Sequence, residues 1–526
     1  MRILHILDHS PPRRSDYSRR VMAILRHQRA LGWKTCQLTG PAHGNLSQDD
    51  SAAAADWQFF RTPPKLGHVS GLVRPLLGTL LTERVRQVVQ LTRPDILHAH
   101  SPATLAFAAL RAGRQARLPV LFEAHAPASA SPEGASWMSP WLDRSTPHQG
   151  ASLLHLPWLD AILPCQPDSA LARFGMRAME AWAARRAGAV VTNSEGMRQR
   201  LLQGGVHAAC IHVIPDAVES GSYRVHGPCR IERRRHPPEA PRHRLRASSA
   251  QLSAQWERRT PAPDAMPPPW VRGRAVVLGF APAYFERHFR EQGEFDGEAA
   301  LDSLLTALVL LNSTGTPVRL LVACRQALHP TLYRAATRHG LAARSAMQPP
   351  NDGPAKAPAW SLMEIYASSC CGPSGASSPG ATYGGAGVLA ALGSPAGQLH
   401  EPAASSLAAA LHASVDIMVF PQRAINSAAG PPRQLLQAMA RGCIVAAANT
   451  AAHRELIEHG RNGVLFEPNE AGALADAVKV LLGSAPRWPD MRASARWLID
   501  YHRNWESCVG MYEPVYEKLL AGRRRR

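Results

Sequence analysis

The sequence lacks the patterns that mark disulfide-rich, zinc-binding and membrane-spanning proteins. Its nine cysteines are scattered over 526 residues, apart from the adjacent Cys370 and Cys371, and no C-x-x-C pair or Cys/His ligand spacing occurs. We therefore expect neither a metal site nor a disulfide framework. No apolar run approaches the roughly 20 residues of a membrane-spanning helix. The opening MRILHIL is strand-like and shows no secretory signal pattern. These absences predict a cytoplasmic protein.

Two phosphate-binding loops are also missing, because neither G-x-G-x-x-G nor a Walker A pattern occurs. Aromatic residues make up only 6% of the chain, whereas lysine and arginine exceed aspartate and glutamate by 59 to 40, a net charge of +19. Such an excess favours anionic partners, among them phosphorylated substrates and anionic membrane surfaces. Without aromatic interleaving or a recognised motif, the basic charge does not predict nucleic-acid binding.

The first 217 residues alternate between strands and helices. Apolar runs predict strands over 2–7, 96–98, 119–122 and 188–192, and helical spacing predicts helices over 21–32, over 102–112 and from about 194. A repeated order of strand, loop and helix indicates parallel strands with crossover helices. Ligands bind such sheets at the carboxyl ends of the strands.

A second domain follows a segment that cannot build a core. Residues 218–272 are rich in proline and arginine, and we predict a disordered linker there. Alternation returns over 273–487, interrupted by a low-complexity insertion at about 346–403. We expect the last residues, 488–526, to form helices that pack back toward the first domain and end in a basic tail.

Three histidines stand at predicted strand ends of the first domain. His98 and His100 lie in LHAHSP, and His125 lies in FEAHAP. A neutral imidazole at such a position can accept a proton or bind a sugar hydroxyl. For His98, which has apolar neighbours, a purely structural role is the alternative. We expect a role in a cleft for His125, whereas a cleft role and a structural role both stay open for His100.

Five sequence blocks resemble family 4 of the retaining glycosyltransferases. They are MRILHILDHS…AILRHQRALGW, RPDILHAHSP, AGAVVTNSEGMRQRL, HVIPDAV and HRELIEHGRNGVLFEP. Together with the closing W…YEPVYEKLL, they are most similar to the subgroup associated with exosortase and exopolysaccharide loci. The resemblance implies a GT-B fold. In that α/β fold two Rossmann-like, doubly wound domains face each other across a cleft, and here they carry disordered insertions.

The resemblance also implies roles for individual residues. His125 matches the histidine that acts on the acceptor side, where His98, His100, Asn193 and Ser194 are also expected. On the donor side the matching positions are Asp16, Gln437, Glu455, Asn462 and Gly463. The basic pair of the family is absent, and Arg287 and Arg290 are its nearest substitutes, with a solvated helix face as the alternative. No metal or cofactor is expected, because in this fold basic side chains and helix N-termini stabilise the departing diphosphate.

The donor half departs from the family pattern. Ala429 and Gln437 stand where the family has two glutamates, and Asp16 adds negative charge where phosphate should bind. Two functions remain open. One is transfer of a hexose from a nucleotide-diphosphate sugar to a lipid-linked or polysaccharide acceptor, at the inner face of the plasma membrane. The other is a catalytically impaired relative that acts as a scaffold or regulator.

Overall fold

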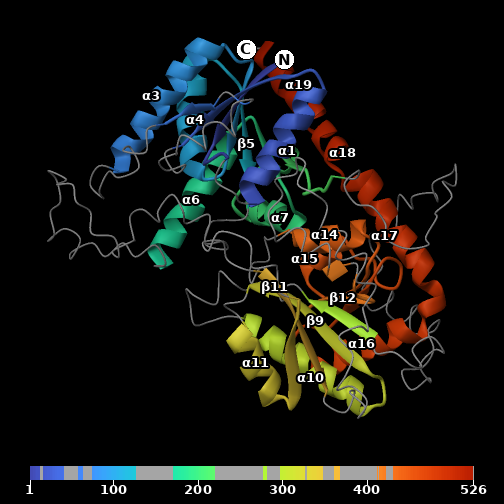
Figure 1. Cartoon of the computed structure of the whole chain (residues 1–526). Coiled ribbons are helices and arrows are strands. Elements are labelled where there is room, and N and C mark those ends of the chain that lie inside the picture. The colour runs from blue at the N-terminus through green and yellow to red at the C-terminus, as the bar shows by residue number, and fades with distance from the viewer. Residues whose placement is uncertain are drawn as a thin grey trace, which may run out of the picture. The chain divides into compact units, whose positions relative to one another are not determined.

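The computed structural model describes residues 1–11, 16–40, 57, 59–62, 74–125, 170–219, 276–280, 296–325, 329–347, 360–367, 411–412, 414–421 and 430–524. They form two compact units. The first consists of Met1–Ala217, Asn426–Gly430 and Arg503–Arg526, and the second of Val218–Ile425 and Pro431–His502. Each unit contains one seven-stranded sheet covered by helices (Figure 1).

The sheet of the first unit is parallel throughout. Its strand order is β3-β2-β1-β4-β5-β6-β7. The strands are β1 (Arg2–Leu7), β2 (Lys34–Thr39), β3 (Phe59–Arg61), β4 (Ile96–His100), β5 (Val120–Ala124), β6 (Ala189–Thr192) and β7 (Ile211–Val213). The order reverses between β1 and β4. In open parallel sheets, the carboxyl ends of strands at such a reversal are where ligands bind.

Helices cover both faces of this sheet. On one face, Leu4, Leu97 and Phe122 join a core with α3 (Arg74–Thr92), α4 (Ala103–Ala116) and α6 (Ala170–Arg186). On the other face lie α1 (Asp16–Ala30), α18 (Trp505–Gly510) and α19 (Tyr512–Arg524). The last two helices are distant in sequence but pack beside α1 (Figure 1). The short α7 (Glu195–Gln203) follows β6.

The second unit has a mixed sheet with the order β10-β11-β9-β8-β12-β13-β14. Its strands are β8 (Val276–Phe280), β9 (Val318–Arg325), β10 (Leu341–Met347), β11 (Trp360–Ala367), β12 (Ile417–Phe420), β13 (Ile444–Ala448) and β14 (Val464–Phe466). Among the strand pairs of the described residues, only β9–β11 and β11–β10 are antiparallel. Its helices are α10 (Asp296–Ser313), α11 (His329–Arg338), α14 (Arg433–Ala440), α15 (Ala451–Arg454), α16 (Ala471–Gly483) and α17 (Trp488–His502).

The two α/β sheets confirm the predicted fold class, and two details differ from expectation. Strand β11 lies inside the stretch 346–403 that we expected to be irregular, because its buried Leu362, Met363 and Ile365 pair it with β9. The C-terminal residues form three helices, and α17 belongs to the second unit, so that only residues from Arg503 onward belong to the first. The proposed linker, 218–272, lies almost entirely outside the described residues. None of the described helices is both long and apolar enough to cross a bilayer.

Candidate functional site

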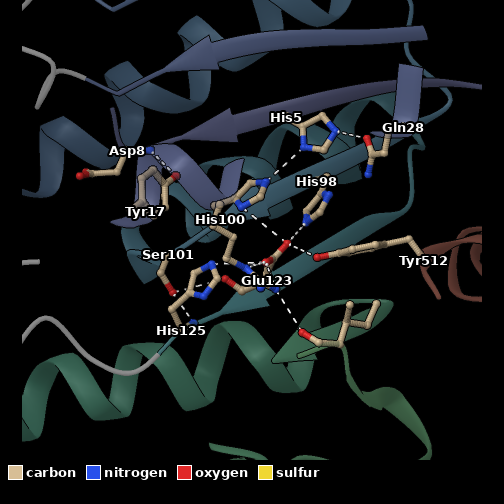
Figure 2. A network of polar contacts seen from close by, with 12 residues as sticks. His5, Asp8, Tyr17, Gln28, His98, His100, Ser101, Glu123, His125 and Tyr512 are labelled. Atoms are coloured by element: carbon tan, nitrogen blue, oxygen red, sulfur yellow. Dashed lines mark hydrogen bonds and ion pairs between the residues drawn. The ribbon is translucent and has the colours of Figure 1, made fainter. Parts of the chain in front are cut away.

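The register of the first sheet brings histidines of two strands next to a glutamate of a third. His5 of β1 pairs with His98 of β4, and His100 of β4 pairs with Glu123 of β5. Directly paired residues point to the same face of a sheet, and so do residues two apart on one strand. The four side chains therefore share one face, beneath α1 and α19, and all four are fully buried. Figure 2 shows them at the centre of a polar network.

Glu123 is the acceptor at the centre of this network. Its Oε1 accepts a hydrogen bond from Arg20 Nε at 3.0 Å, and its Oε2 accepts one from the Tyr512 hydroxyl at 2.8 Å. His98 Nε2 lies 2.9 Å from Oε2, and His125 Nε2 lies 3.4 Å from Oε1. A buried carboxylate is tolerated only when such partners replace the lost water.

Arg20 connects Glu123 to a second carboxylate. Besides Glu123, it pairs with Asp216 and donates to the carbonyl oxygen of Ile214 at 3.2 Å. Asp216 also accepts from Asn193 Nδ2 at 2.9 Å. Two carboxylates thus share one guanidinium, and the group carries a net charge of −1 when the histidines are neutral.

Burial and the neighbouring charges set the protonation states. Burial by itself would raise the pKa of Glu123, but Arg20 and the surrounding histidines outweigh it and hold that pKa well below its usual range. Burial lowers the pKa of His5, His100 and His125, so these imidazoles are neutral near pH 7. Burial also raises the pKa of Tyr512, which stays a hydroxyl donor.

His125 is the member of the cluster nearest to solvent. Its side chain is 15% exposed, whereas those of His98, His100 and Glu123 are completely buried. The backbone N–H of His125 donates to Ser101 Oγ at 3.0 Å, and Tyr17 packs edge-on against its ring at 6.1 Å. His125 directly follows β5 and Asp8 directly follows β1, so both lie at the carboxyl edge of the sheet (Figure 2).

The other acceptor-side candidates have structural partners. His98 and His100 are buried in the cluster, where they can orient His125 but do not reach solvent. Ser194 is fully buried, and its side chain caps α7 by accepting from the Met197 N–H at 3.1 Å. Asn193 is half-buried and holds Asp216.

The donor-side candidates are spread over the second unit. Gln437 lies on α14 and Glu455 follows α15, both half-buried. Asn462 is buried and shapes its own turn by donating to the carbonyl oxygen of Leu456 at 2.9 Å. At Gly463 a Cβ atom would lie 3.2 Å from the carbonyl oxygen of Val445, so glycine fits the close packing there. Arg287, Arg290 and the side chain of Asp16 lie outside the described residues.

Several members of the network were not predicted from the sequence. They are His5, Arg20, Glu123, Asp216, Tyr512 and Tyr516. The sequence does hold one indication that Arg20 is buried. It directly precedes the buried Val21 and lies one helical turn before the buried Ile24 on α1. The remaining contacts depend on strand register and on the return of the C-terminal helices, which local sequence patterns do not encode.

Two family models match the chain. A glycosyl transferase 4-like domain matches residues 17–217, and a glycosyl transferases group 1 domain matches residues 397–484. A search of curated proteins finds no match.

Solved structures of the GT-B type resemble the whole chain at low identity. The lipopolysaccharide outer core galactosyltransferase WaaB is 10% identical with a TM-score of 0.53, covering 98% of this chain and 100% of that one. Sucrose-phosphate synthase from Thermosynechococcus elongatus is 14% identical with a TM-score of 0.51, covering 99% of each chain. Anabaena HepE in complex with UDP is 14% identical with a TM-score of 0.50, covering 98% and 100%. At these identities the likeness establishes the fold alone. The chain thus carries a glycosyl transferase 4-like domain and a glycosyl transferases group 1 domain on a GT-B fold.

Proposed function

We propose that this protein transfers a hexose, with retention, from a nucleotide-diphosphate sugar to a lipid-linked or polysaccharide acceptor in cell-envelope glycan synthesis. The observation that carries the proposal is the placement of His125. A neutral, partly exposed imidazole lies at the carboxyl edge of the sheet in the matched 4-like domain, with a buried carboxylate 3.4 Å behind it. A neutral imidazole can accept a hydrogen bond from a sugar hydroxyl.

In this reaction the bond between the anomeric carbon and the diphosphate oxygen breaks, and the nucleoside diphosphate leaves with that electron pair. The acceptor oxygen bonds to the anomeric carbon while the proton of the acceptor hydroxyl passes to the leaving phosphate oxygen. His125 would orient the acceptor hydroxyl, while Glu123 and Arg20 hold the imidazole in place from behind. On the donor side, Gln437 would bind a ribose hydroxyl through a neutral amide. The solved structures that resemble this chain include HepE with UDP-glucose and a galactosyltransferase, which supports a nucleotide-sugar donor.

The net charge of +19 supports a membrane-associated acceptor. Lysine and arginine near an anionic bilayer each contribute about 1 kcal/mol, an attraction that salt weakens. We infer that the protein works as a peripheral protein at such a surface, where a lipid-linked acceptor would be presented.

A scaffold or regulator is the second candidate, and one observation favours it. Gln437 and Ala429 replace the two donor-side carboxylates of the family pattern, so the donor would lose charge-assisted hydrogen bonds. A protein that binds no nucleotide sugar would fit this candidate instead.

Replacing His125 with alanine separates acceptor chemistry from donor binding. The variant should bind the nucleotide sugar as the wild type does, because its proposed contact is with the acceptor. Transfer should fall by about 100-fold or more, the usual contribution of a positioned acid–base group. The checks are calorimetric titration with the donor and a radiolabelled-sugar transfer assay. His207→Asn, at an exposed histidine of the same unit, is the control. Unchanged transfer in His125→Ala would contradict the role.

A further inference from the structure

Three groups with free electron pairs face one another in the buried cluster. Within the described residues, His100 Nδ1 and His125 Nε2 are buried without a hydrogen-bond partner. The first lies 3.6 Å from Glu123 Oε2 and the second lies 3.4 Å from Glu123 Oε1. Figure 2 shows both rings turned toward the same carboxylate.

The hydrogen bonds behind His100 fix which of its nitrogens carries the proton. Gln28 Nε2 donates to Tyr516 Oη, so Gln28 Oε1 accepts from His5 Nε2 at 2.8 Å. A neutral His5 then has its lone pair on Nδ1, which accepts from His100 Nε2 at 3.1 Å. A neutral imidazole has one N–H and one lone pair. The lone pair of His100 is therefore on Nδ1, and it faces the carboxylate of Glu123.

Exchanging the oxygen and nitrogen of the Gln28 amide still leaves a lone pair of an imidazole facing the Glu123 carboxylate. The Tyr516 hydroxyl would then donate to Gln28, and His98 Nδ1, at 2.8 Å, would have to donate to Tyr516. That choice leaves the lone pair of His98 on Nε2, only 2.9 Å from Glu123 Oε2. With every imidazole of the cluster neutral, one bare imidazole nitrogen faces the carboxylate in either orientation of the Gln28 amide. The orientation in the structure keeps that nitrogen farther from the carboxylate.

We propose that His100 Nδ1, Glu123 and His125 Nε2 form a binding site for a divalent transition metal such as Zn²⁺. Imidazole nitrogen and carboxylate oxygen are ligands that this class of ion prefers, and Mg²⁺ and Ca²⁺ do not take imidazole readily. With metal–ligand distances of about 2.0–2.2 Å, the ligand atoms of a tetrahedral site lie about 3.3–3.5 Å apart. His125 Nε2 lies 3.4 Å from Glu123 Oε1 and His100 Nδ1 lies 3.6 Å from Glu123 Oε2, so each imidazole faces a different oxygen of the carboxylate. One ligand atom from each of the three residues lies within 4.8 Å of the other two.

The surroundings of these three residues resemble the outer shell of a metal site. A histidine ligand typically donates its second N–H to a fixed partner, as His100 does to His5, and a carboxylate ligand is itself hydrogen-bonded, as Glu123 is to Tyr512. Arg20 adds one positive charge near the site, but Glu123 and Asp216 together carry two negative ones. A cation therefore enters a group with a net charge of −1. Three protein ligands leave a fourth position for water.

Metal binding would inhibit the transfer reaction. This consequence rests on the proposed function, in which His125 accepts a hydrogen bond from the acceptor through its other ring nitrogen, because Nε2 is buried against Glu123. An ion on Nε2 leaves the proton of the neutral ring on that other nitrogen, which can then no longer accept. Zn²⁺ should therefore lower transfer without weakening donor binding.

The binding test uses the full chain, freed of metal with a chelator and titrated with Zn²⁺ alone by calorimetry. We expect a Zn²⁺ site that Mg²⁺ does not occupy. His125→Gln should weaken Zn²⁺ binding by at least about tenfold. Loss of a residue that only supports a ligand already weakens metal binding by about that factor, and His125 is proposed as a ligand itself. The matched control, His207→Asn, should bind as the wild type does. If Zn²⁺ does not bind, or binds His125→Gln as tightly as wild type, the site is refuted.

Two further measurements complement the titration. X-ray absorption needs no variant and no activity, and a transfer assay tests the link between the metal and His125. X-ray absorption of the Zn²⁺-loaded wild type should show imidazole in the metal's first coordination shell, and a shell without imidazole would overturn the proposal. In transfer assays Zn²⁺ should inhibit and a chelator should restore activity. Inhibition that is equal in wild type and in His125→Gln would refute the link to His125. Should the wild type transfer no sugar at all, the titration still decides the metal site, while the proposed function alone fails.

Discussion

The charged side chain of Glu123 is buried, and its hydrogen-bond donors determine how much it contributes to stability. The side chain is fully buried and receives hydrogen bonds from Arg20 and Tyr512. Such a pair is weak evidence for net stability, because desolvation of two charges offsets most of their attraction. Replacing the Glu123 carboxylate has a different effect, because it removes the acceptor of two charge-assisted hydrogen bonds while Arg20 keeps Asp216.

Replacing Glu123 with glutamine should therefore destabilise the first unit. Arg20 would keep its ion pair with Asp216, but the hydrogen bonds that Arg20 and Tyr512 donate to the Glu123 carboxylate would become neutral or be lost at the amide nitrogen, at a cost of about 1–3 kcal/mol. Urea denaturation followed by tryptophan fluorescence measures it. The control is Glu83→Gln, whose pair with Arg86 is exposed, and this variant should unfold like the wild type. Equal stability of Glu123→Gln and Glu83→Gln would show that the buried network contributes nothing.

His412 links the stability of the second unit to pH. Arg441 donates to its Nδ1 at 2.7 Å, and burial together with that positive charge lowers the pKa of His412 to about 3. In the unfolded chain this histidine takes up a proton below about pH 6.5, but in the folded chain it stays neutral. Folding stability is therefore lost as the pH falls from about 6.5 toward 3, by about 2 kcal/mol at pH 5.

His412→Gln should remove this part of the pH dependence, since a glutamine oxygen can accept from Arg441 without titrating. Urea denaturation at pH 7 and at pH 5 gives the comparison. The loss of stability between the two should be smaller in the variant by about 2 kcal/mol. His207→Gln, at an exposed position, should lose as much as the wild type. The prediction is wrong if all three proteins lose the same amount.

At the scale of helices and strands, α19 completes the first unit from the far end of the sequence. Tyr512 donates to Glu123, and Tyr516 contacts both His98 and Gln28. Both tyrosines are fully buried, in a core shared with Ile3 and Leu121 of the sheet. The C-terminal helix is thus part of the site's support.

Tyr512→Phe tests this contribution with a minimal change. The ring stays but Glu123 loses a donor, which should cost about 1–2 kcal/mol of stability, since hydrogen bonds to charged groups are stronger than neutral ones. Tyr501→Phe is the control, because Tyr501 lies on α17 and is 59% exposed. Thermal denaturation should show a lower Tm for Tyr512→Phe alone. An unchanged Tm of Tyr512→Phe would mean that the hydrogen bond from Tyr512 to Glu123 contributes no net stability.

Local patterns predicted most elements well, and the reason is visible in particular segments. The strand expected over 2–7 is β1, and the apolar run at 417–420 is β12. Both strands are buried on both faces of a sheet, and such strands consist of nearly continuous apolar residues. Strand β11 was missed inside low-complexity sequence. His98, His100 and His125 were predicted from their place at strand ends, but the pairing of His100 with Glu123 needs the register, which the sequence does not display.

For the whole molecule, the central claim is that it binds a nucleotide sugar and transfers the sugar. Its most direct test is a thermal-shift measurement with UDP-, GDP- and ADP-linked sugars. A donor at 100 times its Kd stabilises the fold by about 2.7 kcal/mol, which should raise Tm by roughly 5–10 °C. Gln437→Glu should bind that donor several-fold more tightly, because its hydrogen bond to the ribose becomes charge-assisted. If no donor raises Tm in either the wild type or Gln437→Glu, the enzyme proposal is contradicted and the scaffold function takes its place.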